Sequence, residues 1–120
     1  MVRIVAMGKW VLVVDDDEDI RNVVVEMLRG AGYTATAAPG GAAALRAMGE
    51  GAPALVLSDI QMRGMDGREL LARTRQLLGP SMPPFVFMTG LATELADTGE
   101  VVLTKPYDLD QLLQAVGHHC

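Results

Sequence analysis

The chain has 120 residues, of which 50% are hydrophobic, and a formal net charge of −5. This length suits a single domain, and an acidic balance without a Lys/Arg-rich stripe argues against direct nucleic-acid binding. The one cysteine, Cys120, excludes a disulfide framework within the chain and fits a reducing cytoplasm, and no apolar run is long enough to span a membrane.

Residues 1–9 are predicted to be an N-terminal extension or linker. They are mostly apolar but lack a small-residue cleavage site, so a signal peptide is not indicated. Five short apolar runs then predict buried strands. The predicted strands are Trp10–Val14, Tyr33–Ala37, Ala54–Ser58, Pro84–Met88 and Val101–Leu103.

Helical patterns separate these strands, with apolar side chains recurring every three or four residues. The predicted helices cover 20–31, 41–48, 66–78 and 109–116. Asp66 with Glu69, and Asp108 with Gln111, have the spacing of capping boxes. Only residues 90–100 lie between the fourth and fifth strands, which allows a short turn of helix at 91–96 and little more. The alternation of strands and helices predicts an α/β fold with a parallel sheet.

Polar side chains stand where four of the predicted strands end. The acids Asp15, Asp16 and Asp17 follow the first strand, Asp59 follows the third, Thr89 the fourth, and Thr104 and Lys105 the fifth. The carboxyl ends of parallel strands share one edge of a sheet, so we expect these groups to lie close together. Carboxylates can hold Mg²⁺, and one carboxylate can attack phosphorus, while a hydroxyl and an ammonium group stabilise phosphoryl oxygens. Asp17 is also a candidate cap of the first helix.

Five short motifs at these strand ends resemble those of the receiver domains of two-component response regulators. The motifs are Val13–Asp16, Ser58–Met62, Met65–Gly67, Met88–Gly90 and Thr104–Tyr107. The resemblance covers about residues 10–117 and leaves a tail at 118–120. It implies a doubly wound, flavodoxin-like sheet of five parallel strands in the order 2-1-3-4-5, with the fourth helix shortened or missing.

The resemblance also implies a role for each site residue. Asp59 would accept the phosphoryl group, and Asp15, Asp16, Asp59 and the backbone carbonyl of Gln61 would bind Mg²⁺. Thr89 would contact the phosphoryl group and Lys105 would pair with it. The Lys105–Pro106 peptide bond would be cis. Gly90 would leave access to the phosphoryl group.

The function that the resemblance implies is Mg²⁺-dependent transfer of a phosphoryl group from a phosphohistidine to Asp59, followed by a conformational switch. The donor would be a histidine kinase or a histidine phosphotransfer protein in the cytoplasm. Such a domain phosphorylates and dephosphorylates only itself, so it is not an enzyme in the ordinary sense. It would stand alone or be fused to a larger protein, without membrane or nucleic-acid contacts of its own.

Three features depart from the family's usual pattern. Arg63 stands where the family usually has proline, which predicts a looser loop after Asp59. The interval from Thr89 to Lys105 is several residues short, as in receivers fused to hybrid histidine kinases. Val102 takes the place of an aromatic residue that many members couple to the threonine.

Two other functions stay open at this point. One is a degenerate receiver that acts only as a binding module. The other is a small phosphohydrolase, because Asp15-x-Asp17 after a strand resembles the opening motif of haloacid dehalogenases. Separately, the edge of the first helix near Ile20 and Val23 resembles the patch that docks a kinase helix in this family, which makes it a candidate for partner contact. His118, His119 and Cys120 suggest a frayed tail more than a metal site.

Overall fold

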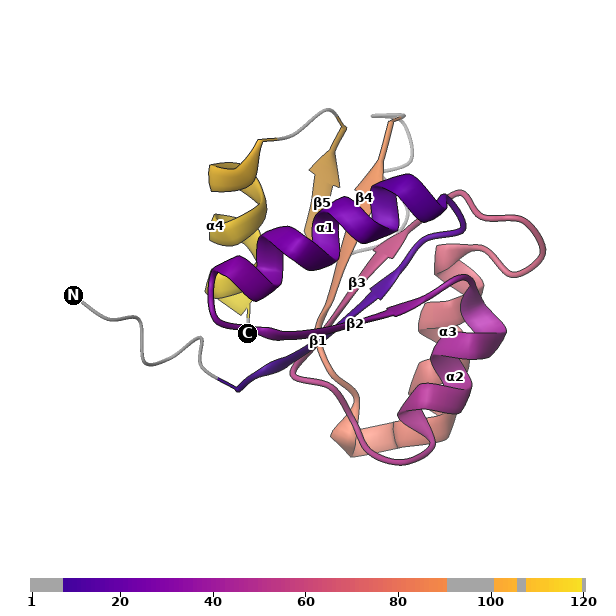
Figure 1. The fold of residues 1–120 in the computed structure, drawn as a ribbon. Coiled ribbons are helices and arrows are strands. Elements are labelled where there is room, and N and C mark those ends of the chain that lie inside the picture. The colour runs from indigo at the N-terminus through magenta and orange to yellow at the C-terminus, as the bar shows by residue number, and fades with distance from the viewer. Residues whose placement is uncertain (1–7, 91–100, 106–107, 120) are drawn as a thin grey trace.

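Parallel strands form the centre of the molecule, and among the described residues they number five, in the order β2-β1-β3-β4-β5 (Figure 1). The computed structural model describes residues 8–90, 101–105 and 108–119. The strands are β1 (Trp10–Val14), β2 (Thr34–Ala38), β3 (Leu55–Asp59), β4 (Phe85–Thr89) and β5 (Val101–Thr104). The helices are α1 (Glu18–Gly30), α2 (Gly41–Met48), α3 (Gly67–Leu78), the short 3-10 turn η2 (Gly79–Ser81) and α4 (Leu109–His119). The predicted fold class and strand order are confirmed.

Helices cover both faces of the sheet, α1 and α4 on one side and α2 and α3 on the other (Figure 1). Successive side chains of a strand point to opposite faces, so β1 supplies Val11 and Val13 to one core and Leu12 and Val14 to the other. The central strands β3 and β4 are buried at every position. This burial on both faces explains why the strands appear in the sequence as continuous apolar runs.

The first strand has its predicted bounds, whereas β2 to β5 each end one residue later than predicted, and the change affects the site. Asp59 and Thr89 are the last residues of β3 and β4, not the first residues after them. Both still take part in the parallel pairing, Asp59 opposite Met88 and Thr89 opposite Thr104. Because the backbone pairing extends through these residues, the sheet itself fixes their positions.

The predicted helix caps are present. The Asp17 carboxylate accepts hydrogen bonds from the backbone N–H groups of Asp19 and Ile20 at the start of α1. The Asp66 carboxylate accepts one from the N–H of Glu69 at 2.9 Å. α4 continues to His119, so the first two residues of the segment predicted as a frayed tail are helical, whereas the domain boundary at 117 stays a prediction. A single glycine, here Gly117, costs a helix about 1 kcal/mol and does not by itself end it.

Several predictions fall on residues outside the described ranges. The shortened fourth helix would lie within 91–100, and the cis Lys105–Pro106 bond involves Pro106. The described ranges contain four α-helices. None of the described helices is long and apolar enough to cross a membrane.

Gly67 carries a testable constraint of this fold. A Cβ there would lie 2.6 Å from the backbone oxygen of Asp59 and 2.9 Å from the Cα of Ile60, and backbone cannot easily move aside. We expect Gly67→Ala to lower the free energy of unfolding by about 1–3 kcal/mol, the usual cost of overpacking. Urea denaturation would measure it.

Gly30→Ala is the matched control, because a Cβ at Gly30 at the end of α1 meets nothing within 4 Å. This variant should be as stable as the parent or slightly more stable. Equal effects of the two substitutions would contradict the close approach of α3 to the end of β3.

Candidate functional site

The predicted site residues meet at the carboxyl edge of the sheet. Asp15 and Asp16 follow β1, Asp59 ends β3, Thr89 ends β4, and Lys105 follows β5. The backbone N–H of Lys105 donates to the carbonyl of Thr89 at 2.7 Å, which extends the pairing of β4 and β5 by one step. The right-handed crossovers of parallel strands place all these ends on one side.

Lys105 is the cation of this cluster. Its Nζ lies 3.0 Å from Oδ2 of Asp59 and 3.8 Å from Oδ2 of Asp15. Its side chain is 24% exposed, so it reaches the acids along a mostly covered path. One ammonium group therefore faces two carboxylates from different strands and offsets at most one of their two negative charges.

Asp15 is the most deeply buried acid of the site, with its side chain fully buried. Its Oδ1 accepts the backbone N–H of Asp17 at 2.9 Å, and its Oδ2 has no hydrogen-bond partner. Burial raises the pKa of Asp15 above its ordinary value of 3.8; the N–H of Asp17 opposes this rise and the charge of Asp59 adds to it. Arg21 of α1 holds the backbone next to this carboxyl, donating from Nη1 to the Asp15 carbonyl at 2.9 Å.

Asp16 is held by Arg63, which lies in the loop after β3. Its Oδ2 accepts the backbone N–H of Arg63 at 3.0 Å and the Arg63 Nε at 3.3 Å. These bonds lower the pKa of Asp16, with the backbone N–H as the largest cause. Whether the loop is looser than one with proline stays a prediction; Arg63 does have the backbone N–H that a proline lacks, and donates it to Asp16. A basic residue four positions after Asp59 was the available signal.

Asp59 and the loop after it are also joined by a hydrogen bond. The backbone N–H of Gln61 donates to Oδ1 of Asp59 at 3.2 Å, so Gln61 sits directly beside the predicted phosphoacceptor. The loop then turns at Gly64, whose φ of +75° favours glycine, before Asp66 caps α3. Whether the Gln61 carbonyl faces the acids stays a prediction.

The remaining predicted residues take different places. Thr89 is fully buried at the end of β4, and its contact with a phosphoryl group stays a prediction. Asp17 is exposed and serves as the helix cap described above. Val102, in β5, is half-buried and packs against the core under α2 and α3. Gly90 is exposed, and a Cβ added to it would meet nothing within 4 Å.

The acids fit a divalent cation. One carboxylate oxygen from each of Asp15, Asp16 and Asp59 lies within 4.8 Å of the others. The buried Oδ2 of Asp15 without a hydrogen bond is an orphaned acceptor of the kind that a cation satisfies. Hard cations such as Mg²⁺ prefer a few carboxylate oxygens together with water.

Comparison with known proteins gives concordant results. The family model described as the response regulator receiver domain matches residues 11–117. The response regulator receiver protein CpdR of Brucella abortus is 34% identical over 114 residues, which cover 90% of this chain and 93% of CpdR.

Two further matches differ in length and kind. The DNA-binding transcriptional regulator NtrC of Escherichia coli is 38% identical over 119 residues, 91% of this chain, which spans only a quarter (25%) of NtrC. The crystal structure of the response regulator TrrA of Thermotoga maritima, in complex with Mg²⁺ and BeF, superposes with a TM-score of 0.84 at 28% identity. It covers 93% of this chain and 99% of TrrA.

The buried Asp15 generates a prediction on pH. A carboxyl whose pKa is raised on folding stabilises the native state below its unfolded value of 3.8, and that stabilisation is lost as the pH rises through the folded value. Asp15→Asn should therefore be more stable than the parent at pH 7 without divalent cations. Thermal unfolding measured across pH would show that the gain in Tm of Asp15→Asn over the parent shrinks as the pH falls toward the unfolded-state pKa of 3.8. A less stable Asp15→Asn at pH 7 would contradict the buried, uncompensated charge.

Proposed function

This chain belongs to the family of response regulator receiver domains, and from that membership we propose that it accepts a phosphoryl group on Asp59. The observation that carries the proposal is the contact of one Lys105 ammonium with Asp59 at 3.0 Å and Asp15 at 3.8 Å. Together with Asp16, these acids concentrate negative charge around a carboxylate that a buried strand holds in place.

The proposed reaction is a displacement at phosphorus. A carboxylate oxygen of Asp59 attacks the phosphoryl group of a phosphohistidine on a histidine kinase or a histidine phosphotransfer protein. The new P–O bond forms as the P–N bond breaks, and the electron pair of that bond returns to the imidazole nitrogen. The product is an acyl phosphate on Asp59.

Lys105 and Thr89 act on the transferred group. Before transfer, Lys105 neutralises Asp59; afterwards, its ammonium can pair with a phosphoryl oxygen in place of the carboxylate. The hydroxyl of Thr89 would donate to another phosphoryl oxygen from the end of β4. Because Lys105 and Thr89 are joined through their backbones, a shift of either residue displaces the other. This link offers a route for a conformational switch that does not need an aromatic side chain at Val102.

Asp15, Asp16, Asp59 and the Gln61 carbonyl would hold Mg²⁺, which neutralises charge on the phosphoryl oxygens when bound. Two of these carboxylates are also held by the protein itself, because Asp16 accepts the backbone N–H of Arg63 and Asp15 that of Asp17. We propose that the protein works in the cytoplasm, alone or as part of a longer regulator. It would turn over no substrate other than its own acyl phosphate.

Asp59→Asn should abolish phosphorylation, because an amide oxygen is a poor nucleophile. The measurement is the hydroxylamine-sensitive phosphate formed with acetyl phosphate and Mg²⁺. Asp110→Asn, which makes the same change of charge at an exposed position of α4, should be phosphorylated like the parent. Circular dichroism should show that both variants fold. Hydroxylamine-sensitive phosphate retained in Asp59→Asn would refute the assignment.

Lys105→Ala should reduce the structural response to phosphorylation, because the phosphoryl group loses its counter-charge. We expect smaller amide chemical-shift changes on adding beryllofluoride and Mg²⁺. Lys9→Ala, just before the opposite end of β1, is the matched control and should respond like the parent. An unchanged response in Lys105→Ala would count against the role of Lys105.

A further inference from the structure

We propose that the Arg63 guanidinium is a built-in competitor of the divalent cation for Asp16, so that cation binding requires Arg63 to leave this carboxylate. The inference rests on the proposed function only in taking Asp16 as a cation ligand. It makes Arg63 a residue that sets how tightly the site binds its metal.

Two parts of Arg63 contact Asp16, and they differ in what they can do. The backbone N–H, 3.0 Å from Oδ2, belongs to the loop and stays with it. The side-chain Nε, 3.3 Å from the same oxygen, belongs to a side chain that is 88% exposed. The backbone therefore positions Asp16, while the guanidinium adds a positive charge that can be removed without rebuilding the loop.

The guanidinium charge lies on Asp16, the same carboxylate that a divalent cation would bind. Asp16 is 25% exposed and is the most accessible of the three acids, whereas Asp15 is fully buried and Asp59 is held by Lys105. A guanidinium and a divalent cation on one carboxylate repel each other, and each weakens the attraction that the carboxylate exerts on the other. Arg63 thus supplies the counter-charge of Asp16 in the absence of metal and opposes the metal when it binds.

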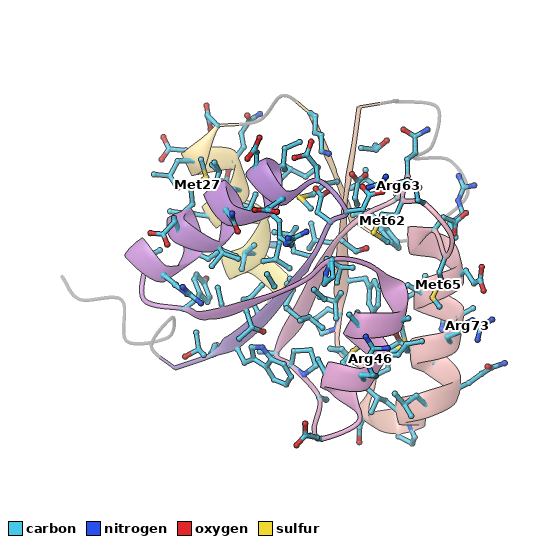
Figure 2. The ribbon with its side chains drawn as sticks, turned by 45° about the vertical axis from the view of Figure 1, so that its right-hand side comes forward. Met27, Arg46, Met62, Arg63, Met65 and Arg73 are labelled. Carbon is cyan, nitrogen blue, oxygen red and sulfur yellow. The ribbon has the colours of Figure 1, made fainter. Side chains whose placement is uncertain are left out.

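The side chain has space to move away. Asp16, Gln61 and Arg63 line one side of an open hollow of about 500 Å³ beside the site. Figure 2 shows Arg63 next to Met62 on the loop that leaves β3, with Arg73 well along α3. An exposed ion pair of this kind contributes little stability, so its loss does not threaten the fold.

The test is a Mg²⁺ titration of the full chain without any phosphodonor. The readout is the NMR chemical shifts of the backbone amides of Gln61 and residue 63. Arg63→Ala keeps the backbone N–H and removes the guanidinium with the rest of the side chain beyond Cβ. We expect it to bind Mg²⁺ about two- to fivefold more tightly than the parent, the range given by an exposed ion pair. In the parent, the Arg63 Nε–H resonance should move as Mg²⁺ is added, since its bond to Asp16 is released.

Two controls separate local competition from overall charge. Arg73→Ala makes the same change of net charge, but Arg73 pairs with Glu69 on α3 at 2.8 Å; its Mg²⁺ affinity should match that of the parent. Raising the salt concentration should reduce the difference in Mg²⁺ affinity between the parent and Arg63→Ala, because salt screens exposed charges.

The possible results are distinct. Equal or weaker Mg²⁺ binding by Arg63→Ala, or an equal gain in Arg73→Ala, would overturn this inference and leave the proposed function standing. A failure of all three proteins to bind Mg²⁺ would overturn the cation site of the proposed function, and this inference with it.

Discussion

The central constraint on this structure is negative charge at the end of a sheet that is buried on both faces. Asp15 is fully buried and Asp59 nearly so, and one ammonium group from Lys105 offsets only part of their two negative charges. Taking carboxylates out of water is costly unless they are paired, so the fold tolerates them only because β5 delivers a cation to the same edge. The Oδ2 of Asp15 faces Lys105 at 3.8 Å but accepts no hydrogen bond, which leaves part of that cost uncompensated. The site is therefore ready for a further positive charge.

The rest of the fold keeps this cluster rigid. The parallel pairing continues to the last residues of β3 and β4, so Asp59 and Thr89 are fixed by backbone hydrogen bonds on a core of Val, Leu, Met and Phe side chains. The first turn of α3 packs directly onto the end of β3, where Gly67 leaves no space for a side chain. A strand end held in this way fixes the position of the Asp59 side chain accurately.

The loop that follows β3 contacts two of the three acids. Arg63 links the loop to Asp16 through backbone and side chain, and Gln61 links it to Asp59. Movements of the loop and changes at the acids must therefore accompany each other. At the opposite side of the site, Val102 packs into the core as a small aliphatic side chain. The backbone contact of Lys105 with Thr89 then remains as the direct connection between β4 and β5 at the site.

The sequence by itself determined the fold class, and its resemblance to receiver domains predicted the strand order that the structure has. It also predicted which residues stand at the carboxyl edge of the sheet. Continuous apolar runs identify strands buried on both faces, and the edge at which parallel strands end follows from the handedness of their connections. Helix caps such as Asp66 are local features, so spacing alone predicts them. Only the tertiary structure decided that Asp59 and Thr89 lie within the strands, that α4 continues to His119, and that Arg63 binds Asp16. The strand ends and the Arg63 contact depend on residues far apart in the chain, 47 positions in the case of Arg63 and Asp16, and no local pattern encodes such a distance.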